Sequence, residues 1–480
     1  MNEQIIRAEE LELYPAIDEV KVDALLRKEI DANQTKIVVL DDDPTGVQTV
    51  HDVSVYTDWT KESIRQGFLE TNKLFYILTN SRGFTVAQTT QAHQEIAQNV
   101  AEVAKELGIH YMIMSRSDST LRGHYPLETK LLKEGMEANG APALDGEILC
   151  PFFKEGGRFT LNNVHYVKYG DELVPAGQTE FAKDKTFGYT SSNVREYVEE
   201  KTGGEYPAGE VIYIDLRSLR CMNIDGITGQ LMAVKDFNKI VVNAIDYCDI
   251  KVFCVALYRA IALGKNFMFR TAAGLVKVMG GISDRPLLTR KDMVVKETDN
   301  GGIVVVGSHT QKTTAQLNAL LTLDCVEGVE FHSNLVLEGD EAFFAEVDRV
   351  VARSEEIIRT GKTAVCYTDR KLLVVENDSK EDALVRSVKI SEGVYSLVER
   401  LHITPAFVIA KGGITSSDVG TKALRVKRAN VMGQIRPGIP VWQTGEESTF
   451  PHTPYVIFPG NVGEEETLKE AVEILQKAEA

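Results

Sequence analysis

The chain has 480 residues, of which 43% are hydrophobic and 26% are charged, as is typical of a globular protein with roughly two to three domains. Its net charge of -17 argues against a nucleic-acid partner, because phosphate backbones are bound by basic surfaces. The six cysteines contain no Cys-x-x-Cys pair, which argues against a disulfide framework and against a zinc site.

The amino-terminal residues and the hydropathy pattern indicate the compartment. The first residues are polar and acidic, unlike a signal peptide. No apolar run approaches the ~18 residues of a membrane span. We therefore expect a cytoplasmic protein that binds small molecules and neither nucleic acid nor a membrane. A homodimer is an open option for its assembly.

The first half of the chain alternates apolar segments with helical patterns. Residues 1–34 predict a helical arm, because Val22, Leu25, Leu26 and Ile30 recur at helical spacing. Strands are expected at 36–40, 53–57, 74–78 and 111–114. A helix before the last of these has an apolar stripe formed by Ile96, Val100, Val103 and Leu107. Such alternation is the pattern of a doubly wound parallel sheet.

Three carboxylates follow directly after the first expected strand. They are Asp41, Asp42 and Asp43, and Pro44 and Gly46 then favour a tight turn. In open α/β sheets, ligands bind at the carboxyl ends of the strands. Because adjacent carboxylates repel, we expect a cation, an arginine or a proton held by a raised pKa beside them. The alternative is an acidic turn in which Asp43 or Thr45 only caps a helix.

Two more polar segments follow strands in this half. Residues 79–83 include Arg82, and residues 115–124 include Arg116, Asp118, Ser119 and Arg122. Guanidinium groups can bind a carboxylate or a phosphate with two parallel hydrogen bonds. The alternative is a loop that is only held together by salt bridges.

The second half begins after a polar, irregular stretch at residues 283–301. We place domain 1–285, with its helical arm, before domain 286–480. The predicted class is α/β, with two domains that each contain a mostly parallel, doubly wound sheet with flanking helices, and with a cleft between them. In the second domain, strands at 303–306, 406–410 and 455–458 are each followed by a turn rich in small residues.

These turns predict a nucleotide-phosphate site. Glycine lets the backbone approach a ligand closely, and unpaired N–H groups at the start of a helix attract phosphate. Lys411 adds a positive charge to the turn at 411–416. The chain lacks a Walker motif and a Gly-x-Gly-x-x-Gly fingerprint, which counts against a nicotinamide-type Rossmann site. The alternative is that these segments are only sharp turns.

In this order, the motifs resemble those of the four-carbon acid sugar kinases, formerly a family of unknown function. The resemblance rests on motifs spread over most of the chain: Asp42-Asp43-Pro44-Thr45-Gly46, Asp118-Ser119-Thr120-Leu121-Arg122-Gly123, Gly157-Arg158-Phe159-Thr160, Gly307-Ser308, Gly412-Gly413-Ile414-Thr415, Pro437-Gly438-Ile439-Pro440 and Gly460-Asn461-Val462-Gly463.

The resemblance implies an ATP-dependent kinase whose first domain binds a small sugar acid and whose second domain binds the nucleotide. The implied nucleotide contacts are Ser308, Gly412, Gly413, Thr415 and Gly460, to which we add Lys411, Gly438 and Asn461. The implied substrate-site residues are Asp42, Asp43, Asp118 and Arg122, to which we add Arg82, Arg116, Ser119 and Arg158.

The predicted reaction is phosphoryl transfer from ATP to a hydroxyl of a tetronate, threonate or erythronate. Mg²⁺ bridges the phosphates, arginines hold the substrate carboxylate, and Asp42, Asp43 or Asp118 accepts the hydroxyl proton. The sequence does not decide which of these three aspartates accepts the proton, and it identifies no metal ligand. Because the two sites lie on different domains, we also expect hinge closure. The alternatives are a nucleotide sensor without turnover and an oxidoreductase with a variant cofactor loop.

Overall fold

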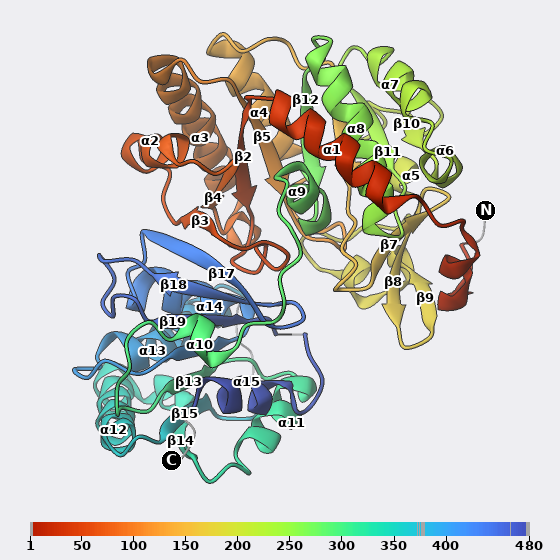
Figure 1. Cartoon of the computed structure of the whole chain (residues 1–480). Coiled ribbons are helices and arrows are strands. Elements are labelled where there is room, and N and C mark those ends of the chain that lie inside the picture. Colours follow the sequence, from red (N-terminus) through yellow and green to blue (C-terminus); the bar gives the residue numbers. More distant parts are fainter. Residues whose placement is uncertain (1–2, 372, 374, 376–379, 461, 477–480) are drawn as a thin grey trace. The chain divides into compact units, whose positions relative to one another are not determined.

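The computed structural model describes residues 3–371, 373, 375, 380–460 and 462–476. Its contacts divide the chain into two units (Figure 1). The first unit contains residues up to Gly46 and residues 58–284, and the second contains residues 47–57 and those from Arg285 onward. Both units combine helices with a mostly parallel sheet, which confirms the predicted α/β class.

The first unit is built on a parallel sheet. Its strands, in spatial order, are β10 (Ile212–Ile214), β11 (Asn238–Val242), β6 (Gly146–Cys150), β12 (Phe267–Thr271), β5 (Tyr111–Arg116), β2 (Lys36–Asp41) and β4 (Leu74–Leu78). Every neighbouring pair is parallel. The register places Asp41 beside Leu78 and Arg116, so the loops that follow β2, β4 and β5 leave the sheet at one edge.

Helices cover this sheet on both faces, since every residue of β2 and β4 is buried. They are α1 (Glu19–Ala32), α2 (Lys61–Leu69), α3 (Val86–Leu107), α4 (Leu127–Ala138), α5 (Val194–Lys201), α6 (Leu216–Arg220), α7 (Ile224–Met232), α8 (Tyr247–Ala262) and α9 (Ala273–Met279). Helix α3 packs on α2 and α4, whereas α1, α6, α7 and α9 pack on α8 (Figure 1).

Local sequence signals explain why helix α3 forms where it does. Thr85 and Gln88 make a reciprocal capping box at its start, and Gly108 ends it with a φ of 66°. Three residues of the predicted apolar stripe, Ile96, Val100 and Val103, are fully buried. The helix therefore contributes to the core that fixes the loop between β4 and α3.

A small antiparallel sheet in the first unit has no counterpart in the sequence predictions. It contains β1 (Ile6–Arg7), β9 (Glu172–Pro175), β8 (Val164–Tyr169) and β7 (Arg158–Leu161). Asn162 and Asn163 form the turn between β7 and β8 with φ of 51° and 67°. Asparagine tolerates this left-handed conformation, so the Asn-Asn pair was the available signal for a hairpin.

The second unit contains a mixed sheet. Its strands, in spatial order, are β3 (Val53–Tyr56), β17 (Arg428–Arg436), β18 (Ile439–Thr444), β19 (Pro454–Phe458), β16 (Val408–Lys411), β13 (Ile303–Val306), β15 (Thr363–Thr368) and β14 (Val326–Phe331). The strands from β19 to β14 are parallel, and β3, β17 and β18 are antiparallel to their neighbours. Strand β3 lies within the range expected for the first domain, yet it pairs with β17 of the second unit.

The helices of the second unit are α10 (Arg290–Met293), α11 (Gln311–Leu320), α12 (Asp340–Arg359), α13 (Lys380–Glu399), α14 (Gly413–Asp418) and α15 (Thr467–Leu475). The apolar side of α15, formed by Leu468, Ala471, Val472 and Leu475, is buried in the core. Val304, Val306 and Phe458 belong to the same core, which holds β13 and β19 in place beneath the glycine-rich turns.

Candidate functional site

The acidic turn of the first unit closes tightly on itself after β2. Asp41 ends the strand, and Asp43 accepts hydrogen bonds from the backbone N–H of Thr45, at 2.7 Å, and from its hydroxyl. A side chain at Gly46 would place its Cβ 2.0 Å from Asp41 Oδ1. Only glycine therefore lets the turn pack against the Asp41 carboxylate.

Two arginines lie among the three carboxylates, as electrostatic repulsion required. Arg82 donates to Asp42 from Nη2 at 2.6 Å and from Nε at 3.2 Å, and it also forms an ion pair with Asp43. The buried Arg116 has its Nη1 2.9 Å from Asp41 Oδ1 and 3.5 Å from Asp42 Oδ1. The acid cluster and the arginines that follow β4 and β5 thus form one network.

The three carboxyl groups of this network have different pKa values. Burial raises the pKa of Asp41 to about 8, although Arg116 partly opposes this. Burial also raises the pKa of Asp42, against Arg82. For Asp43, burial is outweighed by Arg82, Arg116 and the Thr45 hydrogen bonds, so its pKa is lowered. The Asp43 side chain is 18% exposed, against 3% for Asp42 and 1% for Asp41, so Asp43 is the accessible, ionised carboxylate.

The loop that follows β5 is held rigidly from several sides. His165 pairs through Nε2 with the carbonyl of Ser119 at 2.7 Å, and the hydroxyls of Tyr189 and Tyr197 donate to the carbonyls of Thr120 and Leu121. Leu121 has a φ of 68°, a conformation that such contacts must stabilise. The loop therefore presents its charged side chains from a fixed backbone.

Asp118 connects this loop to the acid cluster. It accepts a hydrogen bond from Arg122 Nε at 2.7 Å, and one of its oxygens lies 3.9 Å from Arg82 Nη1. Burial opposes its ionisation, but Arg82 and Arg122 outweigh burial and hold the pKa of Asp118 well below its usual range. Asp42, Asp43, Asp118, Arg82, Arg116 and Arg122 are therefore brought together, as expected for side chains at one sheet edge.

A second pair of guanidinium groups shares an aromatic ring. Arg122 and Arg158 lie 5.0 and 5.6 Å from the ring centre of Phe181. Nε of Arg158 is buried and has no hydrogen-bond partner among the described residues. Phe181 and Asp184, whose carboxylate lies 3.8 Å from Arg122 Nη1, were not predicted. They follow the antiparallel hairpin, and only its folding brings them to this loop.

The glycine-rich turns of the second unit form a cradle at the carboxyl ends of β13, β16 and β19. Gly412 has a φ of 121°, and a Cβ there would lie 3.4 Å from Thr415 Oγ1 and 3.5 Å from Ser308 Cβ. A Cβ at Gly460 would lie 4.0 Å from the Gly412 Cα. The predicted residues Ser308, Gly412, Thr415 and Gly460 are thus close neighbours.

Lys411 lies beneath this cradle as a buried cation. Its Nζ donates to the carbonyls of Pro459, at 2.6 Å, and Gly460, at 3.2 Å. Burial, and then the nearby Lys312, lower its pKa to about 7. The absence of a carboxylate from these causes means that an anionic ligand would stabilise the charged form.

The remaining predicted nucleotide residues differ in how they are placed. Gly413 is exposed at the start of α14. Gly438 lies in the turn between β17 and β18, where a Cβ would approach Val462 Cγ1 to 3.2 Å, so this turn adjoins the loop after β19. Asn461 lies outside the described residues.

Arg370 is a residue of this edge that the sequence analysis missed, because the strand before it, β15, was not predicted. Its Nη2 donates to the carbonyl of Ser308 at 2.7 Å and to Thr314 Oγ1 at 2.9 Å. Arg370 thus contacts a predicted nucleotide residue directly.

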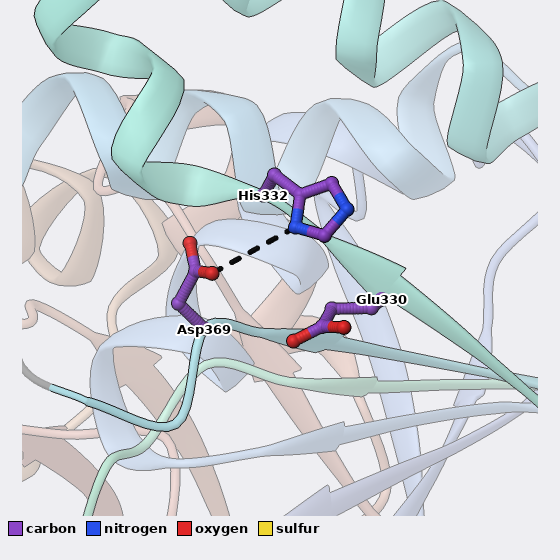
Figure 2. Close-up of side chains that lie close together, drawn as sticks. All are labelled: Glu330, His332 and Asp369. Atoms are coloured by element: carbon purple, nitrogen blue, oxygen red, sulfur yellow. Dashed lines mark ion pairs between the residues drawn. The ribbon is translucent and has the colours of Figure 1, made fainter.

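A group of possible metal ligands lies at the same sheet edge. Figure 2 shows Glu330 and His332, at the end of β14, close to Asp369, which follows β15. One ligand atom from each lies within 4.8 Å of the others, and His332 Nδ1 is 3.8 Å from Asp369 Oδ1. Mg²⁺ prefers oxygen ligands and seldom binds imidazole. This group therefore does not fit the Mg²⁺ that was expected with ATP.

Comparison with family models identifies both halves of the chain. A sugar-binding N-terminal domain matches residues 37–279, and a nucleotide-binding C-terminal domain matches residues 303–468. The chain belongs to the four-carbon acid sugar kinase family. The family resemblance is thereby confirmed, and the acid–arginine cluster lies in the sugar-binding domain while the glycine cradle lies in the nucleotide-binding domain.

Solved structures of the same architecture are distant in sequence. Protein HI1011 of Haemophilus influenzae has a TM-score of 0.58 and 16% identity, over 91% of this chain and 100% of that chain. A Salmonella typhimurium LT2 protein, provisionally named as a tRNA synthase, has a TM-score of 0.65 and 15% identity, over 91% and 98% of the two chains. Identities this low establish the fold alone.

None of the curated proteins matches this chain. Among the helices that the structure describes, none has the length and apolarity that a membrane crossing requires.

Proposed function

We propose that this protein is an ATP-dependent kinase that phosphorylates a hydroxyl group of a small sugar acid with four carbons. The observation that carries the proposal is the presence of a sugar-binding and a nucleotide-binding family domain in one chain. A sugar and a nucleotide together are the substrates of a phosphoryl transfer.

The sugar acid binds at the carboxyl edge of the first unit. Arg122 and Arg158 bind its carboxylate, since the two guanidinium groups share the Phe181 ring and Arg158 keeps a buried, unpartnered Nε within the described chain. Ser119 and Asp118 orient its hydroxyls. Arg82 and Arg116 act mainly by holding the acid cluster, since both form ion pairs with it.

Asp43 is the acceptor of the hydroxyl proton. It is the most exposed carboxylate of the cluster and its pKa is lowered, so it is ionised at neutral pH. A loose phosphoryl-transfer transition state requires little proton removal early on, so orienting the hydroxyl is the larger part of this role. Asp41, with a pKa near 8, stays protonated and limits the charge beside Asp43.

ATP binds in the cradle formed by Ser308, Gly412, Thr415 and Gly460, with Lys411 as a nearby positive charge. Mg²⁺, when bound with ATP, neutralises charge on the phosphates. The hydroxyls of Ser308 and Thr313, whose Oγ atoms lie 3.2 Å apart, are hard oxygen donors that fit this ion.

The test is an assay of ADP release with Mg²⁺ and ATP over a panel of four-carbon sugar acids. The proposal requires ADP to form only when an acid is present, together with a phosphorylated acid. Binding of ATP without turnover on any acid would indicate a sensor instead. Binding of a nicotinamide with no affinity for ATP would indicate an oxidoreductase.

A further inference from the structure

Arg370 is a cation that the described chain leaves partly without partners. One of its nitrogens, Nη2, donates hydrogen bonds to the carbonyl of Ser308 and to Thr314 Oγ1. The other two, Nε and Nη1, are buried and make no hydrogen bond within the described part of the chain. An arginine stays protonated inside proteins, so this site holds a positive charge with free donors.

The nearest carboxylate along the chain does not neutralise Arg370. Asp369 is turned toward His332 and Glu330, as Figure 2 shows. Its Oδ2 accepts hydrogen bonds from Ser333 Oγ at 3.1 Å and from the N–H of Asn334 at 2.9 Å. Among the residues that the structure describes, no carboxylate forms an ion pair with Arg370.

The surroundings of Arg370 favour an anion. Burial lowers the pKa of Arg370, and Tyr367 partly counteracts this. Arg370 in turn helps burial to lower the pKa of His309. Arg370 is half-buried, and a charge that is partly withdrawn from water is unfavourable unless a ligand supplies the opposite charge. The missing partner is therefore an anion with several acceptor oxygens.

The position of Arg370 indicates which anion this is. Strand β13, which leads to Ser308, lies between β15, which leads to Arg370, and β16, which ends at Lys411. Two cations without carboxylate partners in the described chain thus flank the Ser308 turn. Phosphate oxygens in this turn would receive positive charge from both sides.

We propose that Arg370 is a nucleotide-binding residue whose guanidinium contacts the phosphate chain of a nucleoside di- or triphosphate held at Ser308. The inference rests on the proposed function, because it assumes that this cradle binds the nucleotide. It adds a phosphate contact from the segment that follows β15, which contains none of the motifs that the chain shares with the four-carbon acid sugar kinases.

The test compares the full-length protein with Arg370→Met, which keeps an unbranched side chain and removes the guanidinium group and its charge. Arg353→Met is the matched control, since Arg353 is an exposed arginine of the same unit that pairs with Glu327 and Glu356. Dissociation constants for ATP, ADP and adenosine are measured by calorimetry with Mg²⁺ present. We expect Arg370→Met to weaken the binding of ATP and ADP by about ten- to a hundredfold. Its dissociation constant for adenosine, and all three dissociation constants of Arg353→Met, should stay within about twofold of the wild-type values.

Two outcomes would overturn the inference: ATP binding by Arg370→Met that equals the wild type, or a loss that is as large for adenosine as for ATP, since a structural role weakens both. Should Arg370→Met fail to fold, the polar but uncharged variant Arg370→Gln is judged by the same ratio of ATP to adenosine loss. Wild-type protein that binds no nucleotide would refute the proposed function itself, a result separate from any difference between variants.

Discussion

The buried carboxyl group of Asp41 should make the stability of the protein depend on pH. Its pKa is about 8 in the folded chain, against an ordinary value of 3.8 for an aspartate side chain. Between about pH 4 and pH 8, the Asp41 carboxyl is therefore protonated in the folded state and ionised in the unfolded state. Stability from this group is fully present below pH 4 and is lost as pH rises through 8.

The magnitude follows from the difference of about four pKa units. Each unit corresponds to about 1.4 kcal/mol, so this group changes the free energy of unfolding by at most about 6 kcal/mol between pH 4 and pH 8. Asp41→Asn mimics the protonated carboxyl and does not titrate. Between about pH 5.5 and pH 7.5, the free energy of unfolding of the wild type should fall by about 3 kcal/mol relative to this variant.

Urea unfolding of both proteins at a series of pH values measures this difference. Asp118→Asn is the control, because the pKa of Asp118 is held low and the group stays ionised throughout this range; its difference from the wild type should not change with pH. If the profiles of the wild type and Asp41→Asn run parallel from pH 5.5 to pH 8, Asp41 is ionised in the fold and the reasoning is wrong.

Three further predictions concern the two sites. Gly46→Ala forces the Asp41 carboxylate to move, since the new Cβ would lie 2.0 Å from it. Urea unfolding should show a free energy of unfolding that is lower by about 1–3 kcal/mol. The control Gly83→Ala, with no atom within 4 Å of its Cβ, should lose less than half of that. ATP affinity should fall as pH rises above about 7, because Lys411 loses its proton there; calorimetry in buffers of different ionisation enthalpy should detect proton uptake near pH 8 in the wild type, and equal uptake in Lys411→Met would contradict this. Asp43→Asn should lower kcat by about 10²–10⁴-fold with little change in the KM for ATP; near-normal turnover in the ADP-release assay would remove Asp43 as the proton acceptor.

The site of the first unit was largely predictable because parallel strands end together. Polar residues after β2, β4 and β5 had to meet, and Arg82 does contact Asp42 and Asp43. The protonation of each acid was not predictable, since Asp41 and Asp43 differ in burial and in arginine contacts that only the folded structure provides.

Residues on segments without a local pattern were missed. Arg370 follows β15, which gave no prediction, and Phe181 reaches Arg122 only through the antiparallel hairpin. The functional roles of the site residues, the homodimer and the hinge closure stay predictions, as does the choice of sugar acid.

The pairing of β3 with β17 has a consequence for biosynthesis. Val53 pairs with Val431, so the ribosome completes the whole first unit before the partner of β3 emerges. Contacts of such long sequence separation form late and slowly. A fragment that starts at Arg285 would leave β17 as an unpaired edge strand, which is prone to intermolecular association. A peptide of residues 47–57 should reduce this association by pairing with β17.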